Sequence, residues 1–153
     1  MKKNLLLKWS LMAFVVFALL LPYGVVGAAP ADGKYTVNYK VLKDGTESTS
    51  MMDNYTVKPA NLTVTGGQAY VTLTLKSSTW ITKFQTERNG QYVDADVIST
   101  NTAANTRVIG FPVPDLDAKL NAYTEVFIPA LSYNGKYDVQ LKFDTASITP
   151  VTP

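Results

Sequence analysis

The sequence contains no cysteine and no histidine. A chain without cysteine forms no disulfides, so its fold has to be stabilised by a hydrophobic core alone. The absence of both residue types excludes most zinc and copper sites, the Ser-His and Cys-His nucleophile systems, and iron held by imidazole or thiolate. Tyrosine, methionine, aspartate and glutamate remain as metal ligands. Neither a nucleophile with its base nor a catalytic pair of carboxylates stands out, so we do not expect an enzyme.

A large excess of one charge is also lacking, since 14 basic residues stand against 12 acidic ones. Three lysines within the first eight residues precede an apolar run at residues 11–21, and small residues follow up to Ala28. This order is typical of a secretory signal peptide cleaved after Ala28. The alternative is a retained membrane anchor, which would need roughly 20 apolar residues. We therefore predict a signal peptide at residues 1–28 and no membrane insertion after its removal.

About 125 residues remain after this segment, which is enough for one domain with a single core. They carry one more acidic than basic residue, because the three lysines leave with the signal peptide. Net charge therefore gives no reason to expect nucleic acid or acidic lipid as a partner. Residues 29–144 are predicted to be the domain. Residues 145–153 are rich in Thr and Pro and are predicted to be an extended tail.

Alternation of apolar and polar residues dominates the rest of the chain and predicts β-strands. The predicted strands are residues 34–42, 68–76, 80–86, 91–98, 106–111, 122–128 and 136–143. Turn signals separate several of them, at Asp44-Gly45, Gly66-Gly67, Asn89-Gly90 and Asn134-Gly135. The pattern indicates an all-β fold, an immunoglobulin-like antiparallel β-sandwich. Two segments lack the alternation, and we expect short helical turns at residues 50–55 and 114–120, the second capped by Asp115.

Tyr133 and Tyr137 are four residues apart at the start of the last predicted strand. Strand alternation puts Tyr137 on the inward face with Val139 and Leu141, and Tyr133 at the mouth of any pocket there. If one phenol loses its proton to bind Fe(III), the other can donate a hydrogen bond that favours the phenolate. Tyrosine is also common in strands with its hydroxyl at the surface, so packing is the simpler explanation of the pair alone.

A second cluster runs from Ser50 through Met51, Met52 and Asp53 to Tyr55. Methionine adapts to flat apolar surfaces, and a helical turn begun by Ser50 would present a hydroxyl and free amide groups to an anion. The alternative is a turn whose methionines close one end of the core. Trp80 and Ile81 open a strand and point to opposite faces. Trp80 is thus either a core residue or a pocket wall.

Taken together, these segments resemble the NEAT (near-iron transporter) domain of Gram-positive bacteria. The matching pieces follow the family's order over about residues 33–144: Tyr35-Thr-Val-Asn-Tyr39, Thr49-Ser-Met-Met-Asp-Asn-Tyr55 with Lys58-Pro-Ala60, Tyr70-Val-Thr-Leu-Thr-Leu75, Ser78-Thr-Trp-Ile81, Asn105-Thr-Arg-Val108 and Tyr133-x-x-x-Tyr137-Asp-Val139. Each piece alone is unspecific, but their joint order is specific.

The resemblance implies a secreted, hemophore-like protein that takes up oxidised haem, Fe(III) protoporphyrin IX, and passes it on for iron acquisition. It implies a haem pocket between a short 3₁₀ turn and the last hairpin. Tyr133 would be the iron ligand, and Tyr137 would donate a hydrogen bond to it. Ser50 would hold a propionate. The other cofactor-binding residues would be Met51, Met52, Tyr55, Trp80 and Ile81.

The resemblance also indicates partners, with haemoglobin as a source of haem and other NEAT-domain proteins as acceptors. Direct haemoglobin binding stays open, because the turn lacks the aromatic residues of haemoglobin-capturing members. Asn134-Gly135 stands where a bulkier pair is expected, which predicts a tighter hairpin. No Leu-Pro-x-Thr-Gly sorting signal is present. This favours a freely secreted carrier over retention at the cell wall, unless the chain is part of a longer one.

Two other classes of function compete with haem binding. A carbohydrate- or matrix-binding adhesion module would stack sugars on exposed Tyr and Trp rings, and it would give no Soret band on mixing with haemin. A purely structural wall domain would not need the Tyr133 hydroxyl.

Overall fold

The computed structural model describes residues 29–152, so the predicted signal peptide lies outside the described residues. The described part forms antiparallel strands in the order β5-β4-β8-β9-β1-β2-β3-β7-β6. The strands are β1 (Gly33–Lys43), β2 (Ala60–Thr65), β3 (Gln68–Lys76), β4 (Ile81–Arg88), β5 (Gln91–Asp94), β6 (Asp96–Asn101), β7 (Thr106–Val113), β8 (Leu120–Ile128) and β9 (Tyr133–Pro150). Three 3₁₀ turns accompany them: η1 (Met51–Tyr55), η2 (Ser78–Trp80) and η3 (Pro129–Leu131). The predicted all-β antiparallel sandwich is confirmed.

The two ends of this strand order meet at Ala95, where the sheet folds over on itself. β5 pairs with β4 and β6 pairs with β7, although one residue separates β5 from β6. The Ala95 N–H donates to the carbonyl of Phe84 at 3.0 Å. Phe84 of β4 stacks on Phe111 of β7, with ring centroids 6.3 Å apart. The rings show that the two halves of the strand order face each other across one core.

The core is built from the inward residues of both halves. β3 has Val71, Leu73 and Leu75 buried, while Thr72 and Thr74 between them are partly exposed. The same alternation buries Val139 and Leu141 of β9. Each fully buried Val or Leu side chain contributes about 1.5–3 kcal/mol by leaving water. The helical turns within residues 29–152 are too short and too polar to span a membrane.

Most predicted strands are confirmed, and β3 agrees with its prediction at both ends. The single strand predicted at residues 91–98 is wrong, because the chain changes layers at Ala95 and leaves β5 and β6 at opposite ends of the sheet. β4 begins at Ile81, since Ser78–Trp80 forms the turn η2. β2 was not predicted. Residues 114–119 form a turn in which Asp115 Oδ1 accepts from the Asp117 N–H, but no regular helix, and Leu120 already begins β8.

The last strand differs most from expectation. Asn134 and Gly135 make no turn, because they pair with Phe127 and Val126 within the β8–β9 ladder. The hairpin instead turns at η3 and Ser132, whose φ of 48° is left-handed. The predicted tail is also different, since residues up to Pro150 belong to β9. Thr149 and Pro150 pair with β1, which supplies partners that residue composition does not reveal.

Candidate functional site

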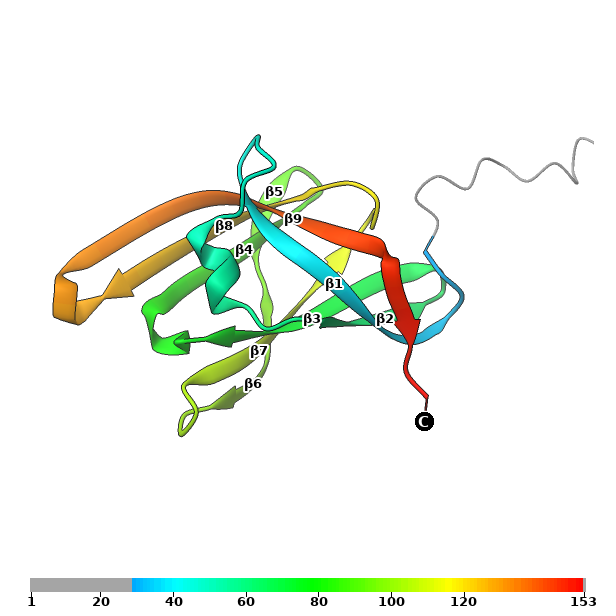
Figure 1. Cartoon of the computed structure of the whole chain (residues 1–153), viewed down its shortest axis with the longest axis horizontal. Helices are drawn as coiled ribbons and strands as arrows, with labels where there is room; N and C mark the ends of the chain where they lie inside the picture. The colour runs from blue at the N-terminus through cyan, green and yellow to red at the C-terminus, as the bar shows by residue number, and fades with distance from the viewer. Residues whose placement is uncertain (1–28, 153) are drawn as a thin grey trace, which may run out of the picture.

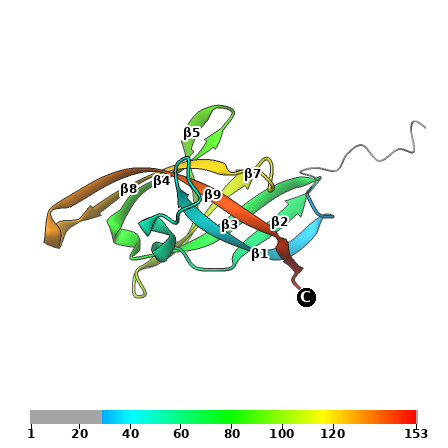
Figure 2. The ribbon, with the colours of Figure 1, turned by 45° about the horizontal axis from the view of Figure 1, so that its top comes forward.

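The β8–β9 hairpin projects beyond the rest of the sandwich, and the turn η1 lies beside it (Figures 1 and 2). Between η1 and the hairpin is a cavity of about 430 Å³, within the size range of small-molecule sites. Methionine, aromatic and β-branched side chains form most of its wall. The lining residues are Lys43, Ser50, Met51, Met52, Tyr55, Val126, Ile128, Tyr133, Tyr137 and Asp138.

Strand register explains why both tyrosines of β9 face this cavity. Tyr133 pairs with Ile128 and Tyr137 with Thr124, and these positions share the inward face with Val139. Farther along the strand that face is covered by the core, but at the hairpin it faces the cavity beside η1. Tyr133 is therefore 41% exposed and Tyr137 36% exposed. The predicted inward direction of Tyr137 agrees with this register.

Gly135 lies between the two tyrosines on the same face of β9. A Cβ atom there would lie 2.8 Å from the Tyr133 hydroxyl and 2.8 Å from the Tyr137 hydroxyl. The two oxygens can therefore be no farther apart than twice that distance. Two phenol groups from one strand thus converge at one point of the cavity wall.

The opposite wall is held in place by the capping of η1. The Met52 N–H donates to Ser50 Oγ at 3.2 Å, which makes Ser50 the N-cap that the sequence predicted. Met52 is buried, and its sulfur lies 3.9 Å from the hydroxyl oxygen of Thr124 in β8. Met51 is 71% exposed at the cavity mouth. The turn thus supplies one buried and one exposed methionine to the same cavity.

Asp53 ties η1 to the sheet from the side away from the cavity. Its Oδ1 accepts from the Val41 N–H of β1 at 2.8 Å and pairs with Lys58 Nζ at 2.9 Å. The Lys58 ammonium also lies 4.6 Å from the centroid of the Tyr39 ring. Burial raises the pKa of Tyr39 to about 12, and its hydroxyl donates to the Val57 carbonyl at 2.7 Å. This network fixes the position of η1 relative to β1.

Trp80 and Ile81 occupy different environments, as their opposite directions predicted. Ile81 is 2% exposed in the core and does not line the cavity. Trp80 meets the edge of the Tyr55 ring, with centroids 6.5 Å apart, and so supports a cavity residue. Arg107 holds η2 through bonds to the Ser78 and Ile81 carbonyls, and burial lowers its pKa. The structure thus brings six of the eight predicted site residues into one cavity.

Four lining residues were not predicted: Lys43, Val126, Ile128 and Asp138. Val126 and Ile128 carry a signal in the sequence, because alternation within the predicted strand 122–128 puts them on the inward face. Lys43 and Asp138 carry none, since both look like solvent-exposed charges until the loop between β1 and η1 is placed beside the hairpin. Lys43 is the one cation among the described residues that line this cavity.

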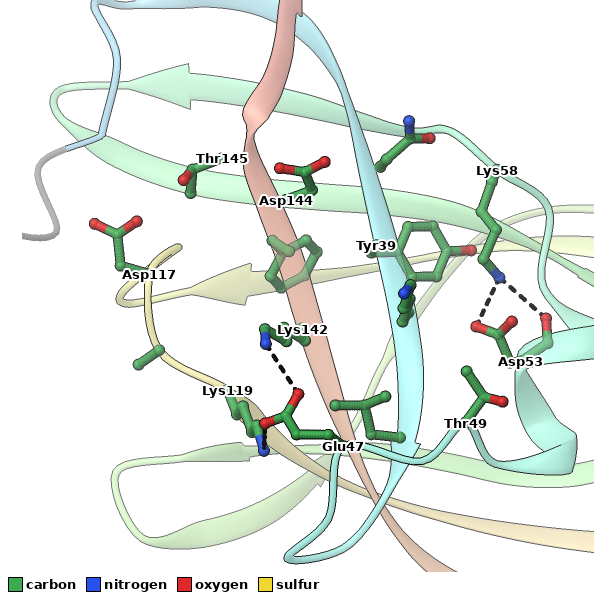
Figure 3. Close-up of a pocket in the computed structure, with 15 residues that line it drawn as sticks. Tyr39, Glu47, Thr49, Asp53, Lys58, Asp117, Lys119, Lys142, Asp144 and Thr145 are labelled. Atoms are coloured by element: carbon green, nitrogen blue, oxygen red, sulfur yellow. Dashed lines mark hydrogen bonds and ion pairs between the residues drawn. The ribbon is translucent and has the colours of Figure 1, made fainter.

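A larger and more polar groove, of about 910 Å³, lies across β1 and β9 (Figure 3). It contains none of the predicted site residues. Its charges pair with one another: Glu47 bonds to Lys119 at 2.6 Å and to Lys142 at 2.9 Å, and these lysines hold the pKa of Glu47 down at about 2. Asp53 and Lys58 form the second pair drawn in Figure 3. The ion pairs of Glu47 therefore hold the loop that carries Ser50 against β9.

Comparison with known proteins gives a consistent result. The Iron Transport-associated domain family, NEAT, matches residues 28–145. Hemin/hemoglobin-binding protein 2 of Listeria monocytogenes is 42% identical over 77% of this chain, which spans 21% of that protein's length. Hemin/hemoglobin-binding protein 1 of the same species is 34% identical over 90% of this chain and 69% of its own length.

Solved structures agree with these relatives. The NEAT5 domain of IsdX2, a Bacillus anthracis hemophore in complex with heme, is 52% identical to this chain. It aligns with a TM-score of 0.73 over 80% of this chain and 99% of its own. Both the family match and the aligned structures cover most of the described residues. The chain therefore belongs to the NEAT family of iron transport-associated domains.

Proposed function

We propose that this chain binds haem as cargo in the cavity between η1 and the β8–β9 hairpin. One observation carries the proposal: two segments far apart in the sequence, residues 50–55 and 133–137, line one cavity with apolar walls and two convergent phenols. The flat apolar wall suits a porphyrin, and a phenol is the donor that remains for iron in a chain without His or Cys. Solved structures of a similar NEAT domain contain heme, which supports haem as the molecule bound by this chain.

Tyr133 is the proposed iron ligand, and Tyr137 is its proposed hydrogen-bond partner. Phenolate stabilises Fe(III), so the cargo is oxidised haem. Removing a proton from Tyr133 leaves a negative oxygen, and a hydrogen bond donated by the Tyr137 hydroxyl favours that charged form. Both oxygens lie 2.8 Å from the position of a Cβ on Gly135, so a small side-chain rotation brings them into contact.

The propionates are proposed to lie at the rim of the cavity near Ser50 and Lys43. Both residues line the cavity, and an ammonium and a hydroxyl are suitable partners for carboxylates. The porphyrin face would contact Met51, Met52 and Tyr55, with Val126 and Ile128 on the hairpin side. Trp80 would act through Tyr55, and Ile81 through Val126, its partner in the β4–β8 ladder.

An open rim also suits release. Met51 and Tyr133 are 71% and 41% exposed, so bound haem would leave part of its edge accessible to another protein. We therefore infer transport and hand-off, not catalysis. Haemoglobin is the proposed source, because two relatives are named for binding it, and other NEAT-domain proteins are the proposed acceptors.

We further propose that residues 1–28 are removed on export and that the domain acts outside the cell or at its surface. Relatives in Staphylococcus aureus are named iron-regulated surface determinants, which supports this location. N-terminal sequencing of the exported protein is expected to begin at Ala29. A protein that keeps Met1 would contradict the cleavage.

The test is titration of the purified protein with haemin, followed by its absorption spectrum. We expect a Soret band and saturable binding, and Tyr133→Ala is expected to lose more than about a hundredfold in affinity, beyond the usual effect of an outer partner. Tyr92→Ala is the matched control, because Tyr92 is a 45% exposed tyrosine outside the cavity. Full affinity in Tyr133→Ala would refute the ligand assignment. Absence of a Soret band in the native protein would refute haem binding and favour an adhesion module.

A further inference from the structure

Gly135 lies in the strand between the two tyrosines of the cavity, and local backbone geometry does not explain why this position is a glycine. It lies within β9, paired with Val126, and its φ is not in the left-handed region that the turn glycines Gly66, Gly67 and Gly90 occupy. Any L-residue could adopt its backbone conformation. A glycine inside a strand weakens the strand, and it commonly marks a place where another group approaches the backbone closely.

The approaching groups are the two tyrosines. A Cβ on Gly135 would lie 2.6 Å from Tyr137 Cε2 and 2.8 Å from each of the two hydroxyl oxygens. Carbon atoms in contact are about 3.5–4.0 Å apart, so a methyl group there cannot coexist with both rings in place. The space that the missing side chain leaves is filled from two sides by the proposed ligand and its partner.

We infer that Gly135 is the positioning residue that lets the phenols of Tyr133 and Tyr137 meet and share a proton. The inference rests on the proposed function, because it assigns the two phenols to one iron site. Residues 133, 135 and 137 alternate onto one face of β9, so a side chain at position 135 would stand between the other two. Glycine at that position leaves room for the two phenol groups to contact each other.

The alternative is that the rings only cover a strand glycine, as aromatic side chains often do. The molecule contains such a case at Gly110 of β7, where a Cβ would lie 2.7 Å from Cε1 of Tyr70. The Tyr70 hydroxyl also lies over Gly110, but it is a single phenol and it donates to the Asp96 carboxylate at 2.7 Å. At Gly135 the hydroxyls of two different tyrosines converge instead. Gly110→Ala is therefore a matched control, with a similar steric conflict far from the cavity.

The first measurement needs no haem. In the protein without cargo, the ring resonances of Tyr133 and Tyr137 are assigned by comparison with Tyr133→Phe and Tyr137→Phe. Gly135→Ala is expected to shift both sets and leave those of Tyr70 unchanged, while Gly110→Ala is expected to do the reverse. Unshifted resonances of Tyr133 and Tyr137 in Gly135→Ala would overturn the inference, whatever haem does.

The second measurement is the haem titration, read as affinity and as the iron–phenolate vibration in resonance Raman spectra. Gly135→Ala is expected to lower affinity about 10- to 100-fold and to change that vibration in the direction seen for Tyr137→Phe. The double variant Gly135→Ala/Tyr137→Phe is expected to bind haem no more weakly than the weaker of the two single variants, because both changes remove the same hydrogen bond. Native affinity and vibration in Gly135→Ala, or additive losses in the double variant, would overturn the inference. Native haem affinity in Tyr133→Ala would instead refute the assignment of Tyr133 as the iron ligand, and absence of a Soret band in the native protein would refute the proposed function.

Discussion

The inward face of β9 has two parts that differ in what covers them. Val139 and Leu141 lie under the opposite half of the sandwich and are 1% and 0% exposed. Tyr133 and Tyr137 continue the same alternation but face the cavity beside η1, and they stay about two-fifths exposed. One uninterrupted pattern therefore produces a core at one end of a strand and a binding surface at the other. The difference comes from the length of β9 relative to the layer that faces it.

This comparison predicts that substitutions in the buried part of β9 lower the stability of the fold, whereas substitutions in the open part weaken haem binding. Leu141→Ala is expected to lower the free energy of unfolding by about 2–5 kcal/mol, because it opens a cavity in a closed core. Haem affinity of the remaining folded protein is expected to be unchanged. Denaturant titration measures the first effect, and haemin titration measures the second. Lys136→Ala, an exposed position on the same strand, is the control. A loss below about 1 kcal/mol for Leu141→Ala would contradict the comparison.

The next effect concerns η1, which lies beside Tyr133 and Tyr137 at the exposed end of β9. Asp53→Ala is expected to lower the free energy of unfolding by about 1–3 kcal/mol, since the Val41 N–H and Lys58 lose their shared partner. Haem affinity should fall with it, because η1 loses its attachment to β1. Asp53→Asn keeps an oxygen for the Val41 N–H and should lose less on both measurements. Equal losses for the Ala and Asn variants would show that the ion pair, not the backbone bond, holds η1.

Ser50→Ala tests a residue that both caps η1 and lines the cavity. Loss of the N-cap is expected to cost about 1 kcal/mol in unfolding free energy. Loss of the proposed propionate contact should weaken haem binding about tenfold. Ser48→Ala, an exposed serine in the same loop, should change neither quantity. Unchanged haem affinity in Ser50→Ala would remove Ser50 from the binding site and leave it a purely structural cap.

The smallest effect is expected at Glu47, which does not line the cavity and pairs with Lys119 and Lys142. Its pKa is lowered from 4.5 to about 2 by Lys119 and Lys142, so the ionised form stabilises the fold above pH 4.5 and loses that effect as pH falls through about 2. Glu47→Gln should therefore flatten the acid dependence of stability between those values. The side chain is exposed, so solvent screening keeps the change small. An altered haem spectrum in this variant would show that these ion pairs and the cavity are coupled.

Much of this arrangement was predictable because alternation is a local signal. β3 and the inward direction of Tyr137 follow from period two, and Ser50 was identifiable as a cap from its residue type and the following turn. The layer change at Ala95 was not predictable, since alternation continues while the hydrogen-bond partner changes from β4 to β7. The pairing of Thr149 and Pro150 with β1 is likewise set by distant residues.

Within the site, the structure differs from the predicted arrangement for two physical reasons. Asn134-Gly135 gives a turn signal, but the alternation of Tyr133, Gly135 and Tyr137 prevails and the glycine serves close packing instead. Ile81 faces inward, yet an inward residue can meet either the core or the cavity. That choice depends on where the opposite layer ends, which no single strand encodes.

The length and position of β9 also have a consequence for folding. β9 lies between β8 and β1, so its hydrogen bonds join the strands β5, β4 and β8 to the strands β1, β2, β3, β7 and β6. β1 is the first strand of the described chain and β9 the last, so their pairing closes the longest loop in the domain. Such high contact order predicts slow folding, with an edge of β1 unpaired until β9 arrives. The cavity for cargo is then among the last features of the molecule to form.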